Sequence, residues 1–154
     1  MKYINPQPYR IIQESVPIFC VDILVMNGKG EYLLVKRKNE PMKGRWWSVG
    51  GRVYKGESVT EAVVRKAKEE IGIKVRILHH LGFYEELYDR SQLNIKGGVH
   101  TVTEVFLVSP ESMNIKLDDT SESYKWSKQL PPKLLSIQPH YSPITVKQLF
   151  KERA

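Results

Sequence analysis

The first part of the chain contains two apolar runs separated by a turn signal. Pro17 to Met26 is apolar and rich in β-branched residues, a pattern typical of a buried strand. Asn27-Gly28-Lys29-Gly30 combines residues that favour turns. Glu31 to Lys36 continues with a second apolar run. The pattern therefore predicts a β-hairpin over residues 17–36.

A helix is predicted in the segment that follows Ser58. Ser58 and Glu61, three residues later, fit a capping box, and Gly72 is a typical residue for the end of a helix. Between these ends, apolar residues recur every four positions: Val59, Val63, Ala67 and Ile71. The stripe predicts an amphipathic helix with one buried face.

The remaining apolar runs predict further strands over residues 73–81, 99–109 and 123–127. Residues 84–98 are largely polar and end in a pair of glycines, so we expect a surface loop there. Ser142-Pro143 fits the start of a terminal helix. Strands mixed with helices indicate a layered α/β domain.

Composition places the chain among ordinary globular domains. Its 154 residues are the usual size of one domain, so we treat residues 1–154 as a single domain. Hydrophobic residues make up 41% and charged residues 27%, which argues against a disordered chain. No apolar run is long enough to span a bilayer, and the first residues lack the apolar stretch of a secretory signal. We therefore expect a cytoplasmic protein that does not contact a membrane.

The net charge of +7 favours a partner that carries phosphate. Charge alone does not distinguish a small nucleotide from a nucleic acid. The sequence lacks a motif of interleaved aromatic and basic residues. We therefore expect a small nucleotide as the ligand rather than a nucleic acid.

Two acidic residues stand in the last turn of the predicted helix. Helical spacing places positions 66, 69 and 70 within an arc of about 100 degrees, and two of them are Glu69 and Glu70. The helix dipole disfavours anions at this end, so a cation is expected nearby. That cation is either Mg²⁺ or Mn²⁺, held with a loop carbonyl and substrate phosphates, or the ammonium of Lys66, one turn before Glu70.

The loop before this helix contains residues suited to a phosphate. Gly50-Gly51 lets the backbone approach a ligand or ion closely. Arg52 follows at once, and its planar guanidinium can hold two phosphate oxygens. The loop therefore favours a site for a nucleotide phosphate next to the acidic end of the helix.

The segment GRVYKGESVTEAVVRKAKEEIGI resembles the Nudix box, whose glycine, glutamates and arginine recur at fixed long spacings. The matching residues are Gly51, Glu57, Arg65, Glu69, Glu70, Gly72 and Ile73. The resemblance extends from Pro17 to Trp126. It implies a Nudix-type α/β/α sandwich with a mixed β-sheet, and divalent-cation-dependent hydrolysis of a nucleoside diphosphate linked to another group.

The resemblance also implies roles for individual residues. Glu69, Glu70 and the carbonyl of Gly50 are the expected ligands of Mg²⁺ or Mn²⁺, and Glu70 is therefore counted as catalytic. Lys66 stands where the family has a further metal-binding glutamate. The site is then expected to hold fewer ions, or Lys66 contacts phosphate or neutralises Glu70. Supporting roles within the box fall to Gly51, Glu57, Arg65 and Gly72.

Among Nudix proteins, the chain looks most like the GDP-mannose mannosyl hydrolases, which cut at the sugar carbon and tolerate loss of that glutamate. The likeness lies in Asp22, Arg37 and Arg52. It implies that all three bind substrate and that the two arginines act in catalysis by steadying the diphosphate leaving group. The subfamily's glutamine ligand and histidine base are replaced by Thr120 and Ser121.

The loss of that histidine leaves the general base open. Three acids in the same loop are candidates if burial raises a pKa, namely Asp118, Asp119 and Glu122. The leading hypothesis is hydrolysis of a nucleotide sugar such as GDP-mannose. The alternatives are a nucleoside triphosphate pyrophosphohydrolase and a nucleotide-binding module without catalysis. A homodimer is compatible with each of these.

Overall fold

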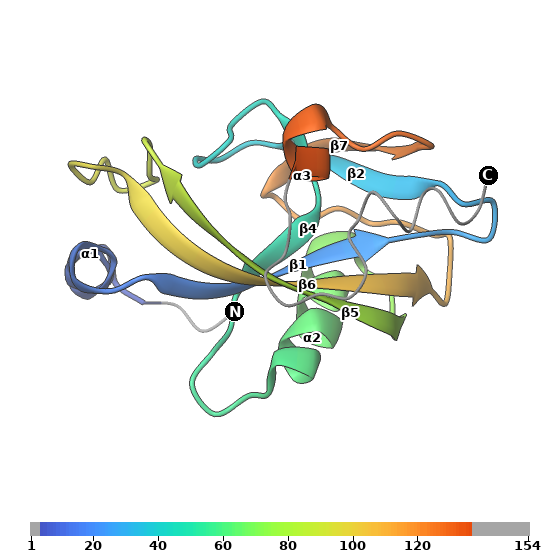
Figure 1. The fold of residues 1–154 in the computed structure, drawn as a ribbon, viewed down its shortest axis with the longest axis horizontal. Coiled ribbons are helices and arrows are strands. Elements are labelled where there is room, and N and C mark those ends of the chain that lie inside the picture. Colours follow the sequence, from blue (N-terminus) through green and yellow to red (C-terminus); the bar gives the residue numbers. More distant parts are fainter. Residues whose placement is uncertain (1–3, 137–154) are drawn as a thin grey trace.

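The computed structural model of the chain describes residues 4–136 (Figure 1). The predicted helix after Ser142-Pro143 lies outside the described residues. The helices are α1 (Pro6–Ser15), α2 (Val59–Ile71) and α3 (Pro132–Ser136). The strands are β1 (Ile18–Val25), β2 (Tyr32–Arg37), β3 (Trp46–Trp47), β4 (Val49–Arg52), β5 (Val75–Tyr88), β6 (Val99–Pro110) and β7 (Ser121–Ser127).

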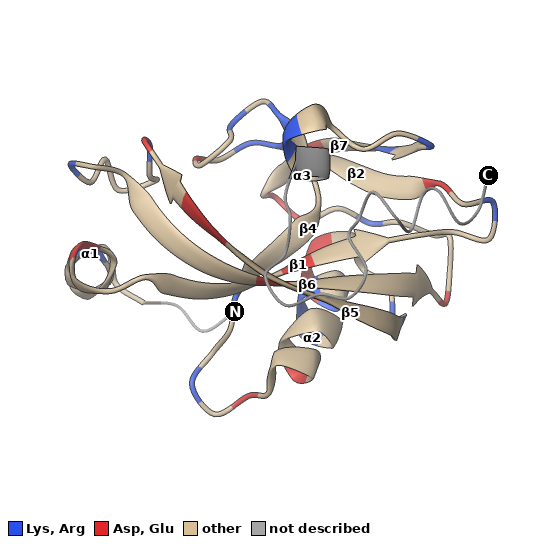
Figure 2. Ribbon diagram, in the orientation of Figure 1, with Lys and Arg blue, Asp and Glu red and all other residues tan. Residues whose placement is uncertain are grey.

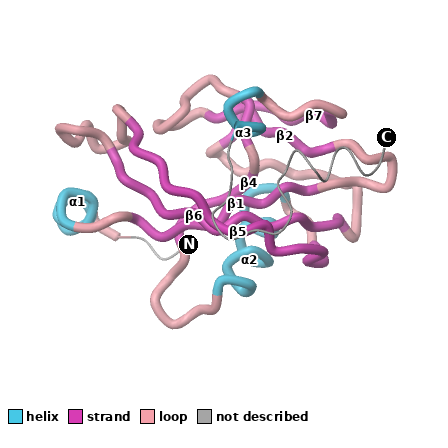
Figure 3. The backbone as a smooth tube through the Cα atoms, viewed as in Figure 1, coloured by secondary structure: helices cyan, strands magenta, loops and turns pink. Residues whose placement is uncertain are grey.

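The strands form two sheets (Figure 3). The first has the order β4-β1-β6-β5 and is mixed, because β1 is parallel to β6 and antiparallel to β4. The second has the order β3-β2-β7 and is antiparallel throughout. The expectation of a mixed sheet is therefore confirmed.

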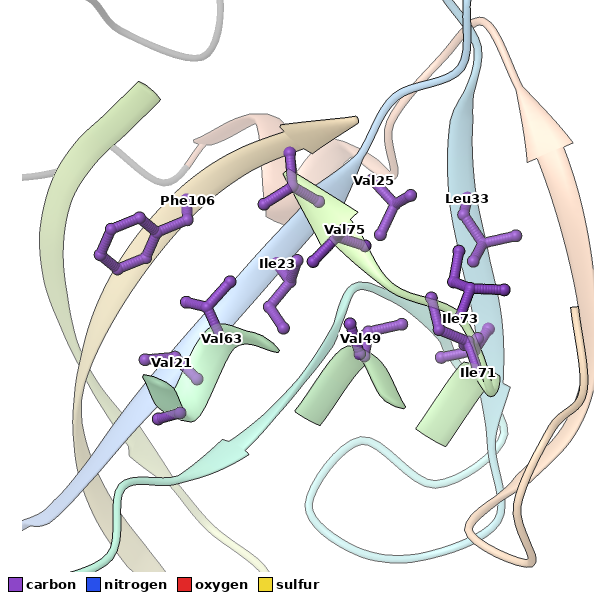
Figure 4. Packing of buried hydrophobic residues seen from close by; sticks show 14 residues of the cluster. Val21, Ile23, Val25, Leu33, Val49, Val63, Ile71, Ile73, Val75 and Phe106 are labelled. Atoms are coloured by element: carbon purple, nitrogen blue, oxygen red, sulfur yellow. The ribbon is translucent and has the colours of Figure 1, made fainter. Parts of the chain in front are cut away.

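From Val21 onward, strand β1 is buried on both faces, and its alternating side chains enter two hydrophobic clusters. Val21, Ile23 and Val25 pack in one cluster with the buried face of α2 (Figure 4). Leu24 and Met26 pack in the other, which includes Leu134 of α3. Helices thus cover both sides of the strands, which confirms the α/β/α sandwich predicted from the resemblance.

Helix α2 forms as the sequence predicts. Ser58 and Glu61 make a reciprocal capping box, and Gly72 ends the helix in the left-handed conformation at φ 73°. Val63, Ala67 and Ile71 of the predicted stripe are fully buried. The amphipathic pattern therefore fixes which face of α2 meets the core and which residues face the loop before it.

The predicted hairpin is wrong, because β1 and β2 do not pair along their length, although the turn between them forms. The side chain of Asn27 accepts the backbone N–H groups of Lys29 and Glu31, and Met26 bridges Tyr32. Beyond that bridge the strands separate into different sheets. The reason is that both edges of β1 are already paired, one with β4 and the other with β6.

Other differences lie where local pattern is weak. Residues 84–88, expected in a loop, extend β5 because they pair with β6. Strand β7 begins two residues earlier than predicted. Helix α1 was not predicted: its inward stripe of Tyr9, Arg10 and Gln13 is polar, whereas Ile11 is 63% exposed. Its pattern is thus the reverse of an ordinary amphipathic helix.

Candidate active site

A cavity of about 250 Å³ is lined by residues of α1, α2 and strands β1 to β6. The residues singled out by the sequence that line it are Asp22, Arg37, Gly50, Gly51, Arg52, Lys66, Glu70 and Thr120. The other box residues Glu57, Arg65, Glu69 and Gly72 are not among the described residues that line it. The structure therefore gathers the predicted substrate-binding residues around one space, together with the supporting residue Gly51. The supporting residues Glu57, Arg65 and Gly72, and the predicted metal ligand Glu69, do not line it.

Lys66 and Glu70 form a buried ion pair at the cavity. The Nζ atom of Lys66 lies 2.5 Å from Oε1 of Glu70, and their side chains are 7% and 10% exposed. Burial raises the pKa of the Glu70 carboxyl above its ordinary value, and the neighbouring Lys66 ammonium opposes that rise. Lys66 is therefore the cation that faces this acid in the described residues.

The two glycines of β4 let the backbone lie against this pair. The backbone N–H of Gly50 donates to Oε2 of Glu70 at 3.3 Å. A Cβ atom on Gly51 would stand 2.8 Å from Cε of Lys66, closer than carbon atoms pack. A Cβ atom on Gly50 would overlap the carbonyl oxygen of Val21 and the carboxylate of Asp22. Close approach to backbone requires glycine at position 50, whereas at position 51 the φ of 154° favours glycine.

Arg65 ties the loop before α2 to the helix. Its guanidinium makes two hydrogen bonds to the Glu57 carboxylate, at 2.9 and 2.6 Å, and lies 3.8 Å from the ring of Tyr54. It also donates to the carbonyl oxygen of Arg52 at 2.8 Å and to Glu69 at 3.1 Å. These bonds to Glu57 raise the pKa of Arg65. The box residues outside the cavity thus position the backbone at Arg52, where β4 ends.

Arg52 and Arg37 reach the cavity from different strands. The guanidinium of Arg52 lies 4.4 Å above the ring of Tyr9, and its Nη1 atom is buried without a hydrogen-bond partner among the described residues. Nε of Arg37 donates to the carbonyl oxygen of Pro41 at 2.8 Å. A buried guanidinium nitrogen without a partner is costly, so a ligand oxygen at this position would be stabilising.

Asp22 is a buried acid in the wall of the same cavity. It is 8% exposed, and its Oδ2 atom accepts hydrogen bonds from the Tyr84 hydroxyl at 2.7 Å and from Trp47 Nε1 at 3.3 Å. Burial raises the pKa of the Asp22 carboxyl, and the hydrogen bond from Tyr84 opposes the rise. An acid with a raised pKa in a cavity is suited to accept or donate a proton.

The three acids proposed as bases on sequence grounds are not among the described residues that line the cavity. Asp118 lies nearest, since its backbone N–H donates to the carbonyl oxygen of Glu70 at 3.1 Å, but its Oδ1 atom accepts from Thr120. Glu122 is paired with Lys36 at 3.1 Å, and Asp119 is exposed. Asp22 and Glu70 are the predicted residues that bring carboxylates to the cavity.

Tyr9, Gln13 and Tyr88 line the cavity but were missed by sequence reasoning. Tyr9 and Gln13 come from α1, which was not predicted because its inward face is polar and its apolar Ile11 is exposed. Tyr88 comes from the part of β5 that was expected in a loop. The spacing of Tyr9, Arg10 and Gln13 could have indicated α1, because residues at i, i+1 and i+4 share one face of a helix.

A NUDIX domain model matches residues 17–145, most of the chain. The chain belongs to the Nudix family. The protein is accordingly a Nudix hydrolase, an enzyme of small-molecule substrates. No helix in residues 4–136 has the length and apolar character needed to cross a membrane. The predictions of a cytoplasmic location and of a possible homodimer stay predictions.

Individual Nudix relatives have varied activities. The low-salt glycan biosynthesis protein Agl8 of Haloferax volcanii is 36% identical over 117 residues. The match covers 76% of this chain and 74% of the relative. An ADP-ribose pyrophosphatase of Methanocaldococcus jannaschii is 35% identical over 119 residues, covering 77% and 66%. The crystal structure of a MutT Nudix hydrolase from Burkholderia pseudomallei matches with TM-score 0.67 at 27% identity, covering 88% and 99%.

Nudix hydrolases generally use divalent cations, but the residues present here do not fit a resident ion. Within residues 4–136, no three His, Cys, Asp or Glu side chains are grouped to hold a metal. Lys66 Nζ contacts Glu70 and stands 3.6 Å from Glu69, whose carboxylate also bonds Arg65. The assignment of Gly50, Glu69 and Glu70 as ligands of Mg²⁺ or Mn²⁺ stays a prediction, and the ammonium between the acids opposes it.

Proposed function

We propose that this Nudix hydrolase cleaves a nucleoside diphosphate sugar at the sugar carbon and releases the free sugar and the nucleoside diphosphate. The observation that carries the proposal is the convergence of three cationic side chains on one cavity: Arg37, Arg52 and Lys66. In Figure 2, blue segments mark Lys and Arg on α2, the helix that carries Lys66. The similarity to a relative named for glycan biosynthesis supports a sugar-linked substrate.

The arginines serve the leaving group. When the bond between the sugar carbon and the phosphate oxygen breaks, the bond electrons stay with the diphosphate. Charge-assisted hydrogen bonds from guanidinium groups stabilise that growing charge. The buried Nη1 atom of Arg52 gains the partner that it lacks in the described residues, and Arg37, held by the Pro41 carbonyl, contributes a second cation.

Asp22 is the residue that we assign to the attacking water. The water adds its oxygen to the sugar carbon and gives up a proton, which Asp22 accepts. The raised pKa of this buried carboxyl suits it to that role. Tyr84 and Trp47 hold the carboxylate through hydrogen bonds to Oδ2. Asp22 thus combines the predicted contact with substrate and the missing base in one side chain.

Nucleoside triphosphate pyrophosphohydrolysis is less well supported. Attack on phosphorus relies on metal ions to neutralise the phosphate oxygens. In this chain Lys66 adds a positive charge beside Glu70, in the part of the site where such ions would bind. A nucleotide-binding module without catalysis remains an outcome that the assay below distinguishes.

The test is turnover of a panel by purified protein, with and without Mg²⁺ or Mn²⁺. The panel contains GDP-mannose, other nucleotide sugars, ADP-ribose and nucleoside triphosphates. We expect a free sugar and a nucleoside diphosphate from one or more nucleotide sugars. Release of pyrophosphate from triphosphates alone would favour the pyrophosphohydrolase. Binding seen by calorimetry without turnover of any compound would refute the proposal and favour the binding module.

A further inference from the structure

We propose that the ammonium of Lys66 takes the place of a resident divalent cation, so that the protein binds a nucleoside diphosphate without metal. The inference rests on the diphosphate site of the proposed function and assigns a ligand chemistry to Lys66. It concerns binding of the diphosphate, whereas the proposed function concerns cleavage, so the two can fail separately.

The position of the ammonium is the first argument. Nζ of Lys66 lies 2.5 Å from Glu70 and 3.6 Å from Glu69, where the acids at the end of α2 need a cation. The side chain is 7% exposed, and Lys66 lines the cavity that also contains Arg52 and Arg37. The ammonium therefore faces both the acids and the space for the ligand.

The surrounding backbone is shaped to this side chain. Any Cβ atom on Gly51 would stand 2.8 Å from Cε and 3.2 Å from Nζ of Lys66. The other oxygen of Glu70 accepts the N–H of Gly50, so the carboxylate is held from two sides. Lys66 thus occupies a fitted position between β4 and α2 rather than a surface position.

Charge balance is the third argument. The Glu70 carboxylate is matched by one ammonium, and the Glu69 carboxylate is shared between Arg65 and Lys66. A divalent ion placed at these acids would stand next to a buried ammonium and be repelled by it. An ammonium has three N–H donors. Glu70 accepts one, and the others suit phosphate oxygens.

Two measurements on the unmodified protein test the proposal. The first is binding of Mn²⁺ alone, followed by the loss of its electron paramagnetic resonance signal. The second is calorimetric titration with GDP, UDP and ADP in EDTA and again in Mg²⁺. We expect no Mn²⁺ binding without nucleotide, and for at least one nucleotide the same affinity in both buffers. Binding of Mn²⁺ alone, or loss of all nucleotide binding in EDTA, would overturn the proposal.

Variants of Lys66 then assign the effect to this residue. Lys66→Met keeps the length of the side chain without its charge, and we expect affinity in EDTA to fall roughly 10- to 100-fold, as for loss of a charged hydrogen bond. Lys66→Glu, which restores the family's residue, should create Mn²⁺ binding. Lys68→Met is the matched control, since Lys68 lies exposed on the same helix. Affinity in EDTA that is unchanged in Lys66→Met would contradict the role of Lys66.

The outcomes separate this inference from the proposed function. Turnover of a nucleotide sugar that requires added metal, together with nucleotide binding that EDTA abolishes, would leave the function standing and overturn the role of Lys66. Binding that survives EDTA, without turnover of any compound in the panel, would leave Lys66 as the diphosphate-binding cation and refute the hydrolysis. Thermal melting of each variant shows whether it is folded, and the tests on the unmodified protein do not depend on it.

Discussion

Arg65 donates a hydrogen bond from Nη2 to the backbone carbonyl oxygen of Arg52 at 2.8 Å. This bond couples α2 to Arg52, the last residue of β4, which lines the cavity. The same guanidinium makes the paired hydrogen bonds to Glu57. Arg65 is not among the described residues that line the cavity, so we propose that it acts by positioning Arg52.

Arg65→Lys is predicted to weaken substrate binding through the loop. A lysine keeps the charge but not the planar fork that bonds Glu57 and the Arg52 carbonyl together. We expect the free energy of unfolding to fall by about 1–3 kcal/mol and KM for the nucleotide substrate to rise more than kcat falls. Urea denaturation and steady-state kinetics measure the two effects. Arg76→Lys, at an exposed position on β5, should change neither, and equal losses in both variants would contradict this role.

Arg52→Gln is predicted to reduce kcat/KM for the nucleotide substrate. The glutamine amide is shorter and uncharged, so the leaving diphosphate loses a charge-assisted hydrogen bond. A loss of roughly 10- to 100-fold corresponds to one hydrogen bond to a charged group. Arg45→Gln is the control, because Arg45 is an exposed arginine outside the cavity. If the two variants have similar kcat/KM values, Arg52 is not the phosphate-binding residue.

The Lys66–Glu70 pair makes a prediction about stability. Glu70→Gln removes the charge that faces a buried ammonium, and breaking such a pair costs about 3–5 kcal/mol. We expect the double variant Lys66→Met with Glu70→Leu to recover a large part of that loss, because no unpaired charge is left. Denaturant unfolding of Lys66→Met, Glu70→Leu and the double variant, which form a closed cycle with the wild type, measures the coupling. Strictly additive losses would show that the two groups do not act as a pair.

Asp22 predicts a dependence of stability on pH. Because the folded pKa is raised by burial above the ordinary value of 3.8, the folded state holds its proton more tightly than the unfolded state. The stabilisation of the folded state by protonated Asp22 is fully present below pH 3.8, and it is lost as the pH rises through the folded pKa. Asp22→Asn should remove that decline and be more stable than wild type at neutral pH, while losing activity. Asp119→Asn, at an exposed acid, should keep the wild-type pH dependence, and an unchanged profile in Asp22→Asn would contradict the assignment.

The local sequence was sufficient to predict helix α2 and the residues that cap its two ends. Its capping box, apolar stripe and terminal glycine all act within a few residues, so pattern alone predicts the helix and the side from which Lys66 and Glu70 face the loop. The same pattern left two alternatives for the cation, metal or Lys66. The buried ammonium at 2.5 Å from Glu70 favours the second, and only three-dimensional contacts could provide that observation.

The parts that could not be predicted depend on partners distant in sequence. Strand β1 pairs with β4 along one edge and with β6 along the other, so neither edge is left to form a hairpin with β2. Residues 84–88 include two glutamates and no β-branched residue, so their strand character comes from pairing with β6. Tyr9 reaches Arg52 only because α1 turns a polar face inward, opposite to the rule for surface helices.

The position of an oxygen label tests the central claim most directly. The protein is incubated with the nucleotide sugar that it turns over best, in water enriched in ¹⁸O, and both products are analysed by mass spectrometry. Attack at the sugar carbon predicts that the label enters the free sugar and that the nucleoside diphosphate stays unlabelled. Label in a phosphate group would contradict the account, because it would place the attack at phosphorus.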